Sequence, residues 1–153
     1  DTYFVVAHFH YVLIGGTMFS FIAGVYYWFP KMTGKMMDET YGLIHFATTF
    51  IFFNAAFYPM HNVGISGMPR RYATYDESLT ELNQFISIFA MLFGFVQLIF
   101  VYNVIYSYKY GKEAGDNPWN GWSLEWATSS PPPENSFVEI PTLITAEEAE
   151  KNE

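Results

Sequence analysis

The stretch FISIFAMLFGFVQLIFVYNVIY, residues 85–106, carries no charged side chain. Its strongly polar side chains are limited to Ser87, Gln97 and Asn103. A helix of about 20 predominantly apolar residues is long enough to cross the hydrocarbon core of a bilayer. These residues therefore predict a transmembrane helix, which the neighbouring apolar residues extend to about 82–108.

Two further apolar stretches, at about residues 3–30 and 41–60, predict membrane spans of similar length. The first contains His8 and His10 as its only readily ionised side chains. The sequence thus predicts an all-α membrane protein, with a transmembrane helical segment over residues 1–112.

Polar and small residues inside the spans predict a packed bundle. His45 and Asn54 stand in an otherwise apolar and aromatic run, so they need partners on neighbouring helices. Pro59 is expected near the end of that helix. Gly15 and Gly16 in the first span would let a neighbouring backbone approach closely.

The charged residues collect outside the spans, although 51% of the chain is hydrophobic and 21% aromatic. The net charge of −8 comes largely from acidic residues after Lys112, which argues against nucleic acid as a partner. Pro131, Pro132 and Pro133 favour extended polyproline geometry. Residues 113–153 are therefore predicted to form an extended, solvated acidic tail without a span.

The chain contains no cysteine, so disulfides, thiolate metal sites and cysteine nucleophiles are excluded. Any metal must be held mainly by histidine. The sequence opens at Asp1 without methionine or a basic leader, and it is interpreted as a fragment or one piece of a split polypeptide.

The lysines predict the direction of the spans. Lys31 and Lys35 lie between the first and second spans, and Lys109 and Lys112 follow the third. Three crossings put both pairs on one side, which the positive-inside tendency makes cytoplasmic. The tail is then cytoplasmic as well, and the histidine pair lies near the outer face with the arginine pair at residues 70–71.

His8 and His10 are the strongest candidates for chemistry. Two positions apart on a helix, their side chains point about 200° apart, so they suit two metal centres rather than one. Phe9 lies between them as the shortest link. Histidine within a span is costly, and neutral imidazole is a common axial ligand of haem iron.

The alternative is that one of these histidines is a hydrogen-bonded bundle residue and the other an interfacial one, but the pair flanking an aromatic residue favours ligation. For His45 and His61 the opposite interpretation is preferred. Each is isolated near a span end, where a hydrogen-bonded or interfacial histidine is common.

Arg70 and Arg71 follow a Gly-Met-Pro turn, which can fix the direction of both guanidinium groups. Guanidinium binds carboxylates bidentately, so haem propionates are candidate partners. The alternative is pairing with Asp76, Glu77 or lipid phosphate. Asp1 could ligate a hard cation, for which carboxylate oxygen is a suitable donor.

The run DTYFVVAHFHYVL at residues 1–13 closely resembles the tenth transmembrane helix of subunit I of haem-copper terminal oxidases. Other elements of that family follow in its order, namely Trp28-Phe29-Pro30, Ile44-His45-Phe46, residues 64–72 (GISGMPRRY), Asn117-Pro118-Trp119 and residues 124–133 (LEWATSSPPP). The resemblance extends to about residue 137, and the tail motif is of the prokaryotic type.

The resemblance implies a role for each candidate residue. His8 would be the proximal ligand of the high-spin haem where oxygen is reduced, and His10 would ligate the low-spin haem. Arg70 and Arg71 would bind haem propionates. Asp1 would belong to a magnesium site near the outer surface.

The resemblance also implies parts that are not in this sequence. The copper-binding histidines, the second low-spin haem ligand and the proton-channel residues would lie upstream, on another chain carrying the N-terminal portion of subunit I. The three spans would be the C-terminal quarter of a twelve-helix bundle. The implied cofactors are two haems, of the a type or alternatively b or o, and copper ligated outside this chain.

The expected function is that of a respiratory terminal oxidase in a prokaryotic plasma membrane, reducing oxygen to water with proton translocation. Its partners would be oxidase subunits II and III, membrane lipid, and cytochrome c or quinol as electron donor. The alternative is a haem-binding membrane electron-transfer subunit without oxygen chemistry. A purely structural helix bundle, without colour, is a third alternative.

Overall fold

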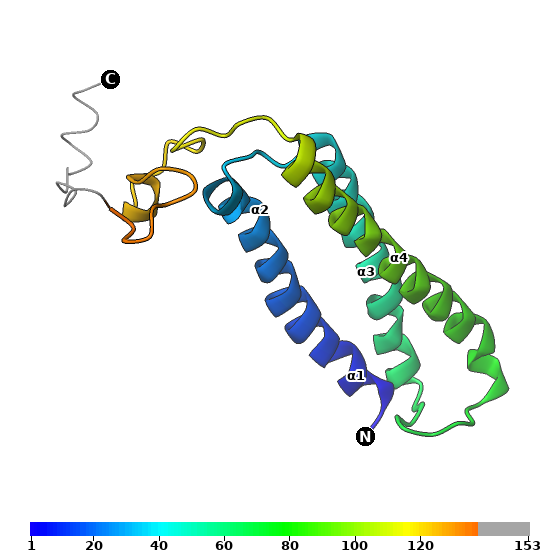
Figure 1. The fold of residues 1–153 in the computed structure, drawn as a ribbon. Helices are drawn as coiled ribbons and strands as arrows, with labels where there is room; N and C mark the ends of the chain where they lie inside the picture. Colours follow the sequence, from blue (N-terminus) through cyan, green and yellow to red (C-terminus); the bar gives the residue numbers. More distant parts are fainter. Residues whose placement is uncertain (138–153) are drawn as a thin grey trace. The chain divides into compact units, whose positions relative to one another are not determined.

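The computed structural model describes residues 1–137, and these form helices joined by short irregular segments, with no β-strand (Figure 1). The chain forms two compact units. The first comprises Asp1–Gly24 and Asp38–Ile105, and the second combines Val25–Met37 with the described residues from Tyr106 to Phe137. The acidic end of the tail, which the sequence predicts to be solvated, lies beyond residue 137 and outside the described residues.

The first helical stretch begins as α-helix α1 (Tyr3–His10), continues as a π-helix over Tyr11–Met18, and ends as α2 (Phe19–Thr33). Thr2 begins α1 as its N-cap, because its side chain accepts a hydrogen bond from the Phe4 N–H at 3.3 Å. The backbone N–H of Phe19 reaches back to the Ile14 carbonyl, which is the wider π spacing.

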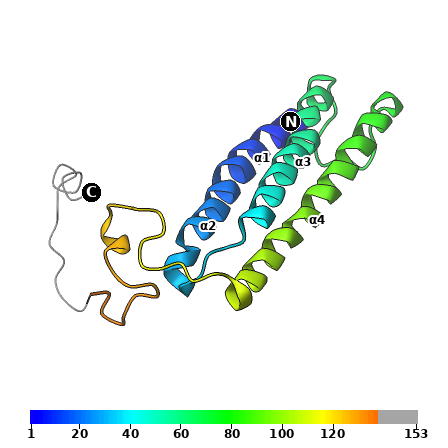
Figure 2. The same cartoon turned by 90° about the horizontal axis from the view of Figure 1, so that it is seen from above.

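Helix α3 (Glu39–Ile65) is capped by Asp38, which accepts from the Tyr41 N–H at 3.0 Å. Helix α4 (Thr80–Tyr110) follows a 3-10 turn at Glu77–Leu79. The two helices run antiparallel (Figure 2). At one end the Asn103 side chain donates to the Asp38 carbonyl at 2.9 Å, and at the other Asn83 contacts Met68.

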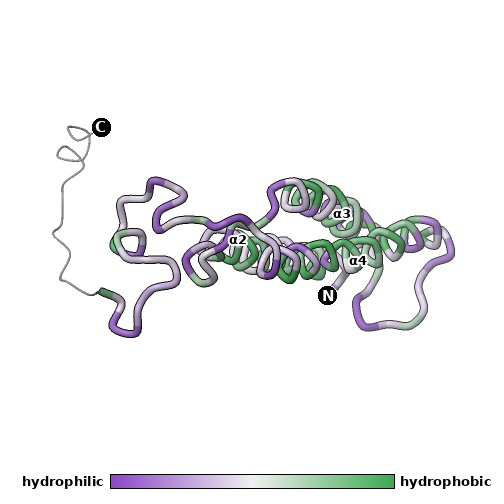
Figure 3. Tube along the Cα trace, turned by 45° about the horizontal axis from the view of Figure 1, so that its top comes forward, coloured by the Kyte–Doolittle hydropathy of each residue, from purple (hydrophilic) through white to green (hydrophobic). Residues whose placement is uncertain are grey.

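Within residues 1–137, three helical stretches are long and apolar enough to cross a membrane, which confirms the predicted number of spans: Tyr3–Thr33, Glu39–Ile65 and Glu77–Tyr110. Figure 3 shows apolar residues concentrated in these helices and hydrophilic ones in the segments between them. Their side chains remain largely exposed, and the second is the most buried of the three. Such exposure of apolar helices is expected for surfaces that meet lipid or further helices.

The observed helices extend beyond the predicted spans of about 3–30, 41–60 and 82–108. Pro30 and Pro59 both lie inside helices, although the sequence placed them at or near helix ends. Proline removes one backbone donor, and transmembrane helices tolerate that loss where neighbouring groups satisfy the carbonyl.

The core of the first unit joins α1, α3 and α4. Ala7 and Ala56 are fully buried, and Phe53, Phe57 and Phe93 form contacting ring pairs with centroids 5.2–6.0 Å apart. Ala7 lies between His8 and Val6 on α1, so this packing fixes the rotation of the helix that carries both histidines.

The second unit contains the only structure described for the tail. Residues 113–137 form turns and one short 3-10 helix at Leu124–Trp126, and Trp126 is buried. The proline-rich composition correctly predicted the lack of a long helix. It did not predict that this segment would pack against the end of α2.

Candidate functional site

His8, Phe9 and His10 occupy the last three positions of α1, where the helix is still regular. At about 100° per residue, the side chains of His8 and His10 leave the helix about 200° apart. Their surroundings differ accordingly, because His8 is exposed whereas His10 is half-buried. The π-helix begins only at Tyr11, so the widened backbone does not alter the spacing of the pair.

His10 is held in one orientation. Its Nδ1 lies 2.7 Å from the Val6 carbonyl oxygen, and its ring stacks between Phe9 and Phe57, with centroids 4.4 and 4.5 Å away. A carbonyl oxygen can only accept, so in the neutral ring Nδ1 carries the proton. The lone pair is then on Nε2, the arrangement found in histidines that ligate a metal.

His8 has no hydrogen-bond partner among residues 1–137. An imidazole within a candidate span that neither donates nor accepts is costly unless another group satisfies it. Both ring nitrogens of His8 are available to such a group. Phe9 is 37% exposed, and its ring stacks on that of His10 with the centroids 4.4 Å apart.

The arginine pair lies at the end of α3, where the chain turns by a Schellman motif. The N–H of Gly67 donates to the Gly64 carbonyl at 3.1 Å, and that of Met68 to the Val63 carbonyl at 3.2 Å. Gly67 has φ +87°, which glycine adopts without strain. The buried Met68 side chain then fixes the start of the Pro69–Arg71 segment.

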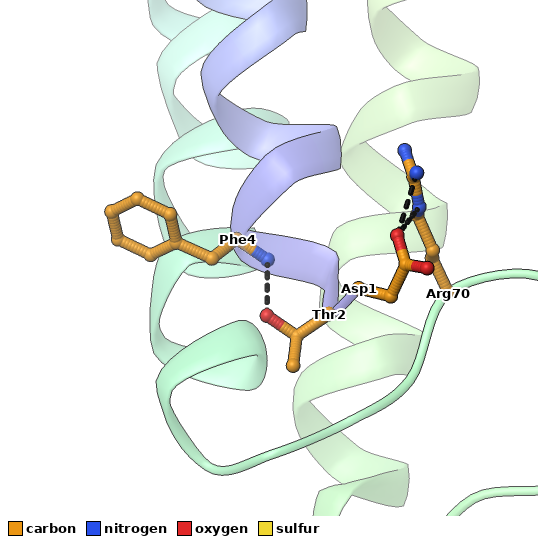
Figure 4. A network of polar contacts seen from close by, with 4 residues as sticks. All are labelled: Asp1, Thr2, Phe4 and Arg70. Atoms are coloured by element: carbon orange, nitrogen blue, oxygen red, sulfur yellow. Dashed lines mark hydrogen bonds and ion pairs between the residues drawn. The ribbon is translucent and has the colours of Figure 1, made fainter.

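Two backbone hydrogen bonds join this segment to the start of the chain. The Tyr3 N–H donates to the Met68 carbonyl at 3.0 Å and the Arg70 N–H to the Asp1 carbonyl at 3.2 Å. The Asp1 carboxylate accepts from Arg70 Nε at 2.8 Å and lies 2.6 Å from its Nη2 (Figure 4). Neither Asp76 nor Glu77 takes part, so the sequence missed the partner of Arg70.

Arg71 differs from Arg70. It is exposed, its backbone has φ +68°, and its side chain has no hydrogen bond or ion pair among the described residues. A left-handed conformation costs a non-glycine residue roughly 1–2 kcal/mol. Strain of this kind is often stored where a side chain has a functional direction.

His45 and His61 are hydrogen-bonded residues, as the sequence analysis preferred. His45 is 2% exposed, and its Nε2 lies 3.1 Å from Oε1 of Gln97 on α4. His61 Nδ1 lies 3.2 Å from the Tyr58 carbonyl, and its ring meets Phe4 edge-on. Asn54 also has the interhelical partner that its position required, because the Tyr11 hydroxyl donates to it at 2.8 Å.

The described residues contain no group of three or more His, Asp or Glu side chains that could hold a metal ion. The candidate ligands that the sequence indicated, namely His8, His10 and the Asp1 carboxylate, therefore do not form one such group with other described His, Asp or Glu side chains. Haem iron can be held by a single histidine, so isolated histidines would suit that group. A magnesium site at Asp1 would need ligands from elsewhere.

The chain is similar to known proteins over most of its length. Residues 1–109 match the family described as "Cytochrome C and Quinol oxidase polypeptide I". Cytochrome c oxidase subunit 1 of Thermostichus vulcanus is 50% identical over 143 residues, which cover 94% of this chain and 26% of that protein. The subunit 1 of Corynebacterium diphtheriae is 54% identical over 147 residues, again 94% of this chain and 26% of the relative. The chain thus spans about a quarter of the length of these relatives.

Proposed function

Because the chain belongs to the cytochrome c and quinol oxidase polypeptide I family, we propose that it supplies one axial histidine to each of two haems in a respiratory terminal oxidase. The oxidase would reduce oxygen to water with proton translocation. This chain would be the C-terminal part of its catalytic subunit.

One observation carries the assignment of ligands. On a single regular helix, His10 has its Nδ1 bonded to Val6 and its Nε2 available, and two positions earlier His8 is exposed with both nitrogens available. The opposed directions allow each ring to meet its own iron. We assign His10 to the low-spin haem and His8 to the high-spin haem of the oxygen-reducing centre.

Haem supplies the electron-transfer and oxygen chemistry when it is bound. The protein contributes orientation and exclusion of water. The Val6 carbonyl and the Phe57 ring hold the His10 imidazole in one orientation. The hydrogen bond at Nδ1 also makes Nε2 a stronger electron-pair donor toward a metal. Phe9 fixes the short separation between the two ligands and lies between the haems.

The arginines divide the recognition of propionates. Arg71 presents an unpaired guanidinium that can bind a carboxylate through two parallel hydrogen bonds. Arg70 uses Nε and Nη2 for Asp1, and its other N–H groups would bind a propionate. Asp1, whose second oxygen carries no described bond, would join a magnesium site completed by another chain.

The remaining parts of the oxidase come from partners in this proposal. Copper and the second low-spin haem ligand are held by the N-terminal portion of subunit I, and subunits II and III complete the complex. Haem a is the proposed type, with b or o as alternatives, and the donor is cytochrome c or quinol. The lysine positions favour a prokaryotic plasma membrane with the lysine-bearing ends and the tail in the cytoplasm.

The test uses the intact oxidase carrying His8→Ala or His10→Ala, with His61→Ala as the matched control. His61 bonds to its own helix, so its removal should leave both haems in place. We expect His8→Ala to remove the high-spin haem spectrum and its reaction with carbon monoxide, and His10→Ala to remove the low-spin spectrum. Loss of the same haem in both variants would reject the assignment. A pyridine haemochrome spectrum identifies the haem type.

A further inference from the structure

The second unit contains a buried cation that joins the tail to the end of α2. Lys31 is 6% exposed, and its ammonium group donates to the carbonyls of Asp116, Thr128 and Ser129 at 2.9, 2.6 and 3.3 Å. An ammonium group has three donors, so this arrangement satisfies all of them. The same group lies 5.1 Å from the centre of the Trp126 ring, within the range of a cation–π contact.

Two tryptophans of the tail bond to one residue of α2. Trp119 donates from Nε1 to the Tyr27 carbonyl at 2.9 Å, and Trp126 donates to the Tyr27 hydroxyl at 2.8 Å. The rings of Trp119 and Tyr27 are stacked with an interplanar angle of 11°. Residues 113–137 are therefore fixed to α2 over the single helical turn that separates Tyr27 from Lys31.

This attachment sets the depth of the tail in the membrane. Tyr27 and Lys31 belong to the last two turns of the candidate span Tyr3–Thr33, so they lie near the level where hydrocarbon gives way to headgroups. Side chains bonded to Tyr27 lie at the same level. The tail therefore begins at the membrane interface. Its acidic composition had instead predicted a segment that extends freely into water.

Exposed aromatic and apolar side chains on α2 and in the tail segment near Trp119 and Trp126 suit the interface. Trp28 is 47% exposed, Trp119 42%, Trp122 62% and Leu124 47%. Tryptophan and tyrosine favour the headgroup region, because an apolar ring with one polar N–H or O–H is satisfied there. Nearby Lys35, which donates to the Gly111 carbonyl at 3.3 Å, and exposed Lys112 carry positive charge that offsets the carboxylates of Glu113 and Asp116.

Glu125 is compatible with this location. Its pKa is lowered, first by a hydrogen bond from its own backbone and then by the Ser123 hydroxyl, with smaller contributions from the Trp28 side chain and from Lys31. The carboxylate therefore stays ionised at neutral pH, close to the Trp28 side chain and Lys31. Charged and aromatic groups interleave here as they do at a membrane surface.

We propose that residues 113–124 form a lipid-headgroup-binding surface, in which Trp122 and Leu124 contact the bilayer interface while Lys31 holds the segment at that depth. The partner is the membrane itself, contacted at headgroup level through aromatic and apolar side chains, because residues 113–124 carry two carboxylates, Glu113 and Asp116, and no lysine or arginine. This surface is independent of the haem ligands, since none of its residues is part of the histidine or arginine pairs.

The test places a fluorescent label on the intact oxidase in nanodiscs of phosphatidylethanolamine and phosphatidylglycerol. This chain has no native cysteine, so single cysteines at Trp122→Cys and Leu124→Cys give defined sites once reactive cysteines of other subunits are blocked. Asn135→Cys, exposed in the same tail, is the matched control. An unchanged haem spectrum confirms that each labelled oxidase is assembled.

We expect labels at 122 and 124 to be quenched by a headgroup-level nitroxide lipid and to lose most of their quenching by aqueous iodide, whereas the label at 135 shows the reverse. Adding Lys31→Met should shift the label at 122 toward the aqueous pattern. Iodide quenching alone at 122 and 124 would overturn the proposal, because the surface would be solvated. Protection from both quenchers would also overturn it, because another protein surface would then cover the site.

Discussion

Gly64, on the last turn of α3, lies so close to Phe4 at the start of α1 that a Cβ atom added at position 64 would be 2.0 Å from the Phe4 nitrogen. The clash would be with backbone, which cannot move aside as a side chain can. This approach fixes how α1, and with it the histidine pair, lies against α3.

Gly64→Ala should therefore displace α1 and destabilise the first unit by about 1–3 kcal/mol, the usual cost of overpacking. We expect a lower haem content per oxidase and a lower thermal midpoint. The matched control is Gly94→Ala on α4, where an added Cβ would meet nothing within 4 Å. That change should be neutral or slightly stabilising, since alanine favours the helix. Equal effects at both positions would show that the close approach of α1 to α3 does not determine the stability of the first unit.

Replacing Arg71 should separate stability from function. Arg71→Gly removes a residue strained at φ +68° and should stabilise the fold by up to about 1 kcal/mol. In the proposed function Arg71 binds a haem propionate. Loss of its positive charge would disfavour the reduced haem, so the midpoint potential of one haem should fall. Redox titration and thermal unfolding measure the two effects. An unchanged potential would remove Arg71 from the haem environment.

The pair between Asp1 and Arg70 should contribute little to stability. The Asp1 side chain is 81% exposed and that of Arg70 24%, so solvent screens their attraction. A double-mutant cycle with Asp1→Asn and Arg70→Gln should give a coupling energy of about 0.2–1 kcal/mol, decreasing with added salt. A coupling that is larger and independent of salt would mean that the assembled oxidase buries the pair.

Gln97→Leu should weaken the contact between α3 and α4. The variant removes the acceptor that lies 3.1 Å from Nε2 of His45, a ring that is 2% exposed. Loss of a partner for a buried polar group costs about 1–3 kcal/mol. The double variant His45→Leu/Gln97→Leu should recover part of the loss, because no buried polar ring remains. Thermal unfolding of the detergent-solubilised oxidase measures both variants.

Lys31→Met should release residues 113–137 from α2. Methionine has a similar length but cannot donate to the three carbonyls, and charge-assisted bonds of this kind contribute about 2 kcal/mol. The open population, and with it the rate of limited proteolysis in this segment, should rise roughly 30-fold. Lys35→Met is the control, since Lys35 donates to a single carbonyl at 3.3 Å. Equal proteolysis of the two variants would contradict the role of Lys31.

Hydropathy predicted much of the fold, because span length and lack of charge depend on local sequence alone. It placed the three spans, and it indicated that His45 and Asn54 would need partners on other helices. The partners themselves, Gln97 and Tyr11, depend on how helices distant in sequence are rotated. Periodicity does not give that rotation when every face of a helix is apolar.

The missing features of the candidate site have a similar origin. The spacing of His8 and His10 predicted their opposed directions because α1 is regular. The pairing of Asp1 with Arg70 could not be predicted, since it arises where the start of the chain meets the turn after α3. Likewise, the sequence indicates only that Lys31 follows the positive-inside tendency. Its burial depends on how the tail folds against α2.

The π-helix at Tyr11–Met18 changes how the first span should be mutated. Its wider turns advance the chain by fewer degrees per residue than α1 does, so a helical wheel drawn through Tyr3–Thr33 assigns wrong faces after His10. A scanning experiment should restart its angular count at Phe19. A one-residue deletion inside the π-helix should convert it to ordinary α-helix. The residues of α2 would then be rotated about the helix axis relative to those of α1, while the sequence of each helix stays unchanged.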